Sequence, residues 1–232
     1  RSNGLRADLA QMVADMKPKF IRFPGGCFVE GNTLENANRW KKTIGDVAER
    51  PGHWNLWGYW SNDGFGAYEF FQYCEDIQAE PLYVINCGMS HREQGFSRLP
   101  DAKSQYKVNV DEYLQDAMDF IEYANGPADS KWGALRAKAG HPAPFNLKYM
   151  EIGNENGGPI YNANYEKFRS AILAKYPKMR LVACDWTGSP DKKYLDILDE
   201  HYYDSPGFFF RSANKYDSYD RKGPKIYVGE YA

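Results

Sequence analysis

The sequence predicts an α/β fold in which parallel strands alternate with helices, arranged as an incomplete (β/α)8 TIM barrel. Three observations support this prediction. Short apolar runs alternate with amphipathic helical patterns, as in successive βα units. Acidic residues follow directly after two of the predicted strands. No Gly-x-Gly-x-x-Gly pattern follows the first strand, which disfavours the structural alternative, a doubly wound open sheet.

The helices are predicted from apolar residues that recur on one helical face, such as Leu5, Leu9 and Met12 in the first of them. This periodicity gives helices at residues 5–16, 66–77, 110–123, 165–175 and, as a short element, 194–198. Short apolar runs bounded by Gly, Pro or polar residues predict the strands. They lie at residues 20–23, 82–86, 147–152, 181–183, 201–203 and 225–228.

Six strands account for about six of the eight βα units of a barrel, which typically needs about 250 residues. The chain has 232 residues, and Glu230 closes the last predicted strand close to the final residue, Ala232. A terminal strand with nothing after it is expected to fray. We therefore expect residues 1–232 to be part of one catalytic barrel whose first and last strands are missing, with no second domain.

Residues 27–62 combine Gly, Trp, Asn and charged residues without a regular period. Loops of this length are usually functional or disordered, and the many aromatic residues favour a functional loop. Across the whole chain 16% of residues are aromatic, and they either fill a large core or line a sugar cleft. Trp54, Trp57 and Trp60 would accordingly stack on sugar rings or anchor the loop.

The composition disfavours several classes of function. The chain has 29 basic and 31 acidic side chains, so nothing indicates a surface that attracts nucleic acid or a membrane. No apolar run approaches the roughly 20 residues that span a bilayer. The four cysteines form no Cys-x-x-Cys pair, so neither a zinc site nor a disulfide framework is indicated. We expect neither a metal nor an organic cofactor.

Glu155 and Glu230 stand at the carboxyl ends of predicted strands, the edge where β/α barrels place their catalytic groups. Cleavage of a glycosidic bond needs such a pair. One carboxylic acid protonates the leaving oxygen, and the other stabilises the positive charge that develops on the anomeric carbon. The alternative is that both are exposed loop glutamates.

The motif Gly153-Asn154-Glu155, with a glutamate ending a later strand, resembles the clan A barrel glycosidases. The finer pattern resembles glycoside hydrolase family 51, the α-L-arabinofuranosidases. Its segments are IRFPGGCFVEG (21–31), RWK (39–41), IG (44–45), ERP (49–51), WN (54–55), GAYEF (66–70), YANG (123–126), Arg136, GHP (140–142), EIGNE (151–155), HYY (201–203) and VGEY (228–231).

This resemblance implies a retaining, exo-acting enzyme that releases arabinose from arabinoxylan or arabinan, with Glu155 as acid/base and Glu230 as nucleophile. It also implies that Asn154 bonds the sugar 2-hydroxyl and that the Tyr203 hydroxyl bonds the nucleophile. His201 would line the sugar pocket; its alternative is a core histidine.

Further site residues follow from the resemblance and from strand parity. Cys27 would lie near the arabinose, with a buried small hydrophobe as its alternative. Arg22 would lie inside the barrel near the carboxylates, and Glu151, which shares the parity of Glu155, is a candidate partner for this buried cation. Asn86 would either shape the floor of the site or cap the following loop. Among the loop tryptophans, we assign Trp57 to substrate binding.

Part of the family's pattern lies outside this chain. A glutamate on the family's first strand, a glutamine beyond the nucleophile and an accessory C-terminal β-sandwich are all absent from these 232 residues. The rival functions are another clan A retaining glycosidase, such as a β-glucuronidase, and a non-catalytic sugar-binding barrel. The resemblance also implies a homo-oligomer in the full-length form, and the sequence leaves localisation open.

Overall fold

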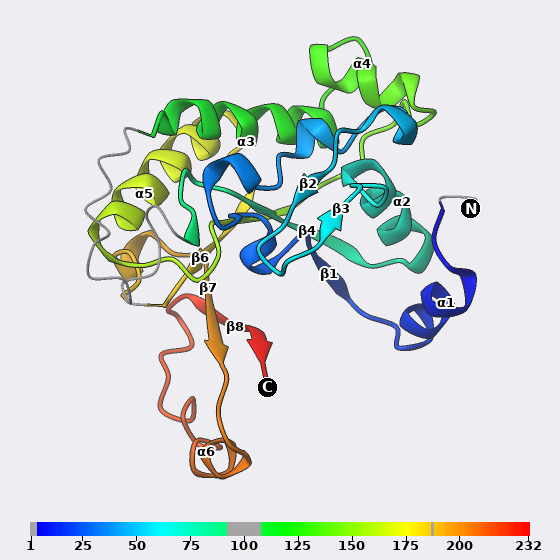
Figure 1. Cartoon of the computed structure of the whole chain (residues 1–232). Helices are drawn as coiled ribbons and strands as arrows, with labels where there is room; N and C mark the ends of the chain where they lie inside the picture. The colour runs from blue at the N-terminus through cyan, green and yellow to red at the C-terminus, as the bar shows by residue number, and fades with distance from the viewer. Residues whose placement is uncertain (1–3, 92–107, 187) are drawn as a thin grey trace.

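The computed structural model describes residues 4–91, 108–186 and 188–232. Six parallel strands form one sheet, and each strand pairs with the next along the chain (Figure 1). The strands are β1 (Phe20–Phe23), β4 (Glu80–Ile85), β5 (Tyr149–Ile152), β6 (Arg180–Cys184), β7 (Ile197–Tyr202) and β8 (Lys225–Tyr231). A doubly wound sheet reverses its strand order at a switch point, whereas a barrel adds strands in sequence. The observed order therefore confirms the predicted incomplete barrel.

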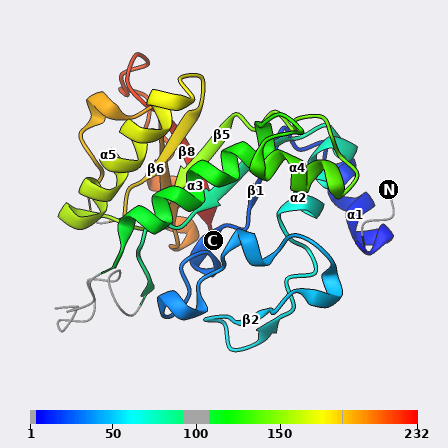
Figure 2. The ribbon, with the colours of Figure 1, turned by 90° about the horizontal axis from the view of Figure 1, so that it is seen from above.

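The helices lie mainly along the outer side of the curled sheet. Viewed from above, α5, α3 and α2 follow one another along it (Figure 2). The helices are α1 (Ala7–Asp15), α2 (Ala67–Ile77), α3 (Val110–Asn125), α4 (Lys131–Lys138), α5 (Gly158–Lys175) and α6 (Pro206–Arg211). The first, second, third and fifth confirm predicted helices. Within the described residues, no helix has the length and apolarity needed to cross a membrane.

One predicted helix, at residues 194–198, is wrong. A single 3-10 turn spans Lys192–Tyr194, and β7 begins at Ile197. The segment is a strand because it pairs on one side with β6 and on the other with β8, which buries Leu198 between neighbours. Tertiary pairing overrides the local pattern here. Helices α4 and α6 were not predicted, and α4 shows why: Gly133 and Arg136, its buried residues, make no apolar stripe.

The long segment after β1 is ordered by short elements and buried side chains. Trp40 is almost fully buried, and Arg50 donates two hydrogen bonds to Glu69 at the start of α2. Strands β2 (His53–Trp54) and β3 (Trp60–Ser61) form an antiparallel pair. Four 3-10 turns lie in the segment between β1 and β2, at Gly26–Phe28, Leu34–Asn36, Trp40–Lys42 and Val47–Glu49. The prediction of an ordered loop is confirmed.

Strand alternation divides the core into two parts. One face of the sheet packs on the helices: Tyr83 of β4, for example, stacks on Phe120 of α3 with ring centroids 3.9 Å apart. On the other face, Leu82, Val84 and Val182 form a small apolar cluster with Val29. This second face is the interior of the barrel.

The interior face also carries charged residues. Arg22 of β1 pairs in register with Leu82, and Glu151 of β5 pairs with Val84. Asp199 of β7 is buried close to both of them, pairing with Arg22 and hydrogen-bonding Glu151. Burying an isolated charge is costly, so these groups must be paired. The barrel interior therefore holds a polar network directly below the strand ends.

Candidate active site

The turn after β5 is shaped by Gly153 and Asn156. Gly153 has φ +78°, and a Cβ at this position would overlap Asn156 Oδ1. That oxygen accepts a hydrogen bond from the Asn154 backbone N–H at 3.1 Å. Glu155 follows with φ +50°, a conformation that costs a non-glycine residue on the order of 1–3 kcal/mol and persists only where its surroundings hold it. The strained turn leaves the Glu155 side chain buried above the barrel interior.

Glu230 reaches the same site through a β-bulge in β8. Asp199 pairs with Tyr227, Glu200 with Val228, and His201 with Glu230, so the register skips Gly229. Strict alternation would place Glu230 on the face opposite Tyr227, and the extra residue reverses this. A Cβ on Gly229 would stand 2.5 and 2.6 Å from the two Asp199 carboxylate oxygens, so only glycine fits.

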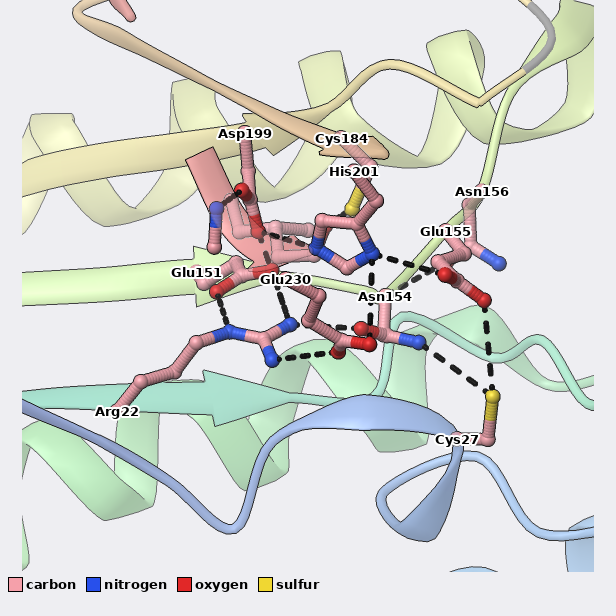
Figure 3. A network of polar contacts seen from close by, with 12 residues as sticks. Arg22, Cys27, Glu151, Asn154, Glu155, Asn156, Cys184, Asp199, His201 and Glu230 are labelled. Carbon is pink, nitrogen blue, oxygen red and sulfur yellow. Dashed lines mark hydrogen bonds and ion pairs between the residues drawn. The ribbon is translucent and has the colours of Figure 1, made fainter. Parts of the chain in front are cut away.

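Arg22 forms the floor of the site (Figure 3). Its Nε and Nη2 donate to the two Glu151 oxygens at 2.7 and 2.9 Å. Nη1 donates to Glu230 Oε1 at 2.9 Å, and Nη2 donates to Asn154 Oδ1 at 2.6 Å. Burial raises the pKa of Glu151 to about 7 against the opposing attraction of the Arg22 guanidinium. Arg22 is thus occupied mainly by protein carboxylates and holds strands β1, β5 and β8 together.

The Glu230 carboxylate is surrounded by donors. Tyr203 Oη donates a hydrogen bond to Oε2, and Arg22 donates to Oε1. Burial works to raise the pKa of Glu230, but the Tyr203 hydrogen bond and the charges of His201 and Arg22 outweigh it and lower the pKa. Glu230 is therefore ionised at neutral pH, as a nucleophile requires.

His201 links the two glutamates to a third carboxylate. Its Nδ1 lies 2.8 Å from Glu155 Oε1 and 3.7 Å from Glu230 Oε2, and its Nε2 lies 2.9 Å from Asp199 Oδ2. Burial lowers the pKa of His201, but the hydrogen bonds to Asp199 and Glu155 raise it to about 10. The imidazole is therefore protonated at neutral pH, with an N–H on each nitrogen.

The two glutamates approach each other closely at the carboxyl edge of the sheet. One oxygen of Glu155, one of Glu230 and a nitrogen of His201 all lie within 4.8 Å of one another. The same three atoms have the spacing of a cation site. However, a histidine protonated on both nitrogens offers no lone pair to a metal, so the arrangement fits a hydrogen-bonded carboxylate pair better.

Asn154 and Cys27 lie beside the carboxylates. The Cys27 thiol contacts Glu155 Oε2 at 3.7 Å, and the Asn154 amide nitrogen contacts Cys27 Sγ at 3.8 Å. Burial and the neighbouring carboxylates raise the pKa of the Cys27 thiol, so it stays neutral and acts as a weak donor. In Figure 3, Cys27 lies below Glu155, and the Asn154 side chain lies between Cys27 and the Arg22 guanidinium.

A cavity of about 540 Å³ adjoins this network. Its lining includes Arg22, Cys27, Trp57, Tyr59 and Gly229. Trp57 is 63% exposed and faces this cavity from the β2–β3 hairpin, in agreement with the stacking alternative.

Trp60 instead lies against Gly52, in agreement with the anchoring alternative. A larger cavity, of about 920 Å³, lies at the opposite ends of the strands beside Arg180, Ile197 and Lys225. Because it lies at the amino ends of the strands, away from the carboxyl edge that carries Glu155 and Glu230, its size says nothing about the site.

Asn86 bonds backbone groups of the neighbouring loops. Its amide nitrogen donates to the Val29 carbonyl at 3.1 Å, and its Oδ1 accepts from the backbone N–H groups of Gly88 and Met89. These bonds match the loop-capping alternative rather than the one in which Asn86 contacts substrate. It is the one candidate residue that the structure does not bring to the site.

Three residues of the network were missed by sequence reasoning: Asp199, Asn156 and Glu30. The Asn156 amide nitrogen donates to the buried carboxylate of Glu30 at 2.6 Å, which supports the Glu155 turn from behind. Asp199 lies two residues before His201, so both side chains point to the same face of a strand; this was the only indication in the sequence that Asp199 belongs to the site. Glu30 gave no sign of being buried within its loop.

The curled parallel sheet with two close carboxylates at its carboxyl edge defines the class: it is typical of β/α-barrel glycoside hydrolases. Comparison with known proteins then gives the family. The chain belongs to the family described as the alpha-L-arabinofuranosidase 1 domain, whose model matches residues 12–221.

Individual relatives agree with this family. The chain is 46% identical to alpha-L-arabinofuranosidase 1 of Arabidopsis thaliana and 39% identical to an extracellular exo-alpha-L-arabinofuranosidase of Streptomyces chartreusis. All of this chain is covered in both cases, but only 33% and 30% of those proteins. An arabinose-bound α-L-arabinofuranosidase of glycoside hydrolase family 51 superposes with a TM-score of 0.86 at 35% identity, covering all of this chain and 36% of that one. The predicted resemblance to family 51 is confirmed, and the chain spans about a third of the length of these relatives.

Proposed function

We propose that the full-length protein is a retaining, exo-acting α-L-arabinofuranosidase and that this chain supplies both catalytic carboxylates. The observation that carries the proposal is the close approach of Glu155, after β5, and Glu230, on β8, at the carboxyl ends of the barrel strands. Family membership supports the choice of sugar, and a Streptomyces chartreusis relative is named an exo-acting enzyme.

In the first step, Glu230 attacks the anomeric carbon of a terminal arabinofuranosyl unit. The bond from that carbon to the leaving oxygen breaks, and Glu155 gives its proton to this oxygen. The lowered pKa of Glu230 supports its role as nucleophile, because the attacking carboxylate must be ionised. The product is a covalent arabinosyl ester on Glu230.

In the second step, Glu155 takes a proton from water, and the water oxygen attacks the anomeric carbon. The ester bond to Glu230 breaks, arabinose leaves with its original configuration, and both glutamates regain their starting states. Two inversions at one carbon give net retention.

The surrounding residues would recognise the sugar. Asn154, held by Arg22, would bond the 2-hydroxyl, a contact that tightens in the transition state. Cys27 lines the cavity beside Glu155, and Trp57 offers a ring face to the leaving part of the substrate. The substrate class we propose is an arabinose side chain on a plant polysaccharide such as arabinoxylan or arabinan.

The test is hydrolysis by the protein at its full natural length of an aryl α-L-arabinofuranoside and, in parallel, of an aryl β-glucuronide. We expect hydrolysis of the arabinofuranoside alone. Preference for the glucuronide would identify another clan A glycosidase. Arabinose binding that survives Glu230→Ala, with no hydrolysis by the wild type, would identify a non-catalytic sugar-binding barrel.

A further inference from the structure

Asp199 is a buried carboxylate that touches both halves of the proposed catalytic machinery. Its Oδ1 accepts a hydrogen bond from the Gly229 N–H at 2.8 Å, within the bulge that turns Glu230 inward. Its Oδ2 lies 2.9 Å from His201 Nε2, and the other nitrogen of that ring contacts Glu155. The Asp199 side chain is only 1% exposed, so it does not meet substrate from the solvent.

These contacts fix where the protons of His201 lie. Because an ionised carboxylate offers only acceptors, the Nε2 that faces the Asp199 carboxylate carries a hydrogen. Nδ1 faces the carboxylates of Glu155 and Glu230 and, in the protonated ring, also carries a hydrogen. His201 thus donates to Asp199 and to Glu155 Oε1 at the same time (Figure 3).

This donation gives the two oxygens of Glu155 different tasks. Oε1 accepts from His201 Nδ1, whereas Oε2 is turned to the Cys27 thiol beside the cavity. An oxygen that accepts a hydrogen bond from a cation is a poor place for a proton. The transferable proton therefore belongs on Oε2.

We propose that Asp199 is a positioning residue that keeps His201 a double donor, and so assigns the proton of the general acid to Oε2 of Glu155. The same carboxylate holds the Gly229 bulge and thereby the direction of Glu230. This inference rests on the proposed function, since it concerns the acid/base and the nucleophile of that reaction.

Other charged and titratable groups face Asp199 and His201 from the neighbouring elements, so the electrostatic environment of the pair depends on several residues. They are Arg22 from β1, Cys27 and Glu30 from the loop after it, Glu151 from β5, Cys184 from β6, Tyr203 after β7, and Tyr227 and Glu230 from β8. None of them contacts His201 Nε2 in the described residues; Asp199 does. Substitution of Asp199 therefore acts on the histidine first.

The test is Asp199→Asn in the full-length protein. The Asn carbonyl keeps the bond from Gly229, and its amide group turns an N–H toward His201 Nε2. That nitrogen must then be an acceptor, so the ring becomes neutral and keeps its hydrogen on Nδ1. The substitution removes the Asp199 anion and the His201 cation together, but the histidine nitrogen is the group that faces the two glutamates. The Glu230 carboxyl, whose pKa the His201 charge lowers, then gives up its proton less readily.

We expect both limbs of the kcat/KM profile against pH to move upward by about 0.5–1 pH unit, because an adjacent opposite charge stabilises a carboxylate by that order or more. The acid limb reports ionised Glu230, and the alkaline limb reports protonated Glu155. We expect kcat for an aryl α-L-arabinofuranoside to fall about tenfold, within the range of general acid–base effects. His201→Gln should move both limbs in the same direction.

The double variant Asp199→Asn/His201→Gln should shift the limbs no further than His201→Gln alone, because Asp199 acts through the histidine. The matched control is Glu200→Gln, the intervening residue on β7, whose carboxylate bonds Tyr202 and Tyr216 on the opposite face; its pH profile should be unchanged. Unmoved limbs in Asp199→Asn, or additive shifts in the double variant, would overturn the inference. If Asp199→Asn does not fold, the His201→Gln variant provides the test: a pH profile whose limbs do not move would then overturn the inference. A wild type that is inactive on arabinofuranosides overturns the proposed function itself.

Discussion

The ends of β5 and β8 place one glutamate each, and they do so by different means. At the end of β5, Gly153 takes a left-handed conformation, and Asn156 bonds the turn that holds Glu155. In β8, the backbone stays extended, and a bulge at Gly229 turns Glu230 inward against Asp199. In both cases a glycine precedes the functional segment because a side-chain oxygen occupies the space of a Cβ. A loop thus fixes one carboxylate, and strand register fixes the other.

Arg22 bonds Glu151 of β5 and Glu230 of β8, so its removal should have the largest effect on stability. Arg22→Met leaves the fully buried Glu151 without its cation, and breaking a buried pair costs about 3–5 kcal/mol. Urea unfolding of the variant and wild type measures the difference. The control is Lys148→Met, which removes the exposed pair with Glu80 and should cost at most about 1 kcal/mol. Equal losses in the two variants would contradict the central place of Arg22.

The two glycines should respond differently to alanine. Gly153→Ala adds an overlap to a strained φ and should destabilise the fold by about 1–3 kcal/mol. Gly229→Ala meets no φ penalty, but it displaces Asp199 and the bulge. A misplacement of about 1 Å can cost about 100-fold in rate, so we expect a loss of kcat with a smaller loss of stability.

Thermal unfolding and steady-state kinetics on both glycine variants separate these outcomes. Gly58→Ala is the control for backbone strain alone, because Gly58 has φ +84° with open space around it. If Gly229→Ala kept full activity, the bulge would not direct Glu230.

Tyr203→Phe should have an intermediate effect that is confined to Glu230. The hydroxyl lowers the pKa of Glu230, so its loss raises that pKa. Activity falls as pH drops through this value, and the acid limb of kcat/KM should therefore move to higher pH, by about 0.5–1 unit. The alkaline limb should stay in place. Tyr202→Phe, which loses a bond to Glu200 on the other face, is the control and should move neither limb.

Trp57→Ala should have the smallest effect on the fold. The side chain is mostly exposed, and such substitutions usually change stability by within about 0.5 kcal/mol. If its ring stacks on the leaving sugar, KM for an arabinoxylan oligosaccharide should rise about 2- to 12-fold, the equivalent of an aromatic contact of about 0.5–1.5 kcal/mol. Trp54→Ala, similarly exposed but outside the cavity lining, should leave KM unchanged. A KM effect of equal size in both variants would argue for a change in the whole hairpin.

The same comparison shows what sequence reasoning can reach. The inward direction of Glu151 could be predicted, because alternation within β5 is local; Glu155 lies beyond the strand, where the turn at Gly153 and Asn156 sets its direction. The orientation of Glu230 could not, since it depends on a register shift between β7 and β8; a glycine inside a strand is only a hint of a bulge. Asp199 was hidden because its strand begins next to a segment that looked helical, and only pairing with β6 and β8 decides its state.

The configuration of the arabinose released first tests the central claim most directly, namely that Glu155 and Glu230 act as a retaining pair. Proton NMR of the full-length protein with an aryl α-L-arabinofuranoside shows the initial anomer before mutarotation equilibrates it. Double displacement at Glu230 predicts the α anomer first. The β anomer first would mean a single displacement by water, and it would contradict the assignment of Glu230 as nucleophile.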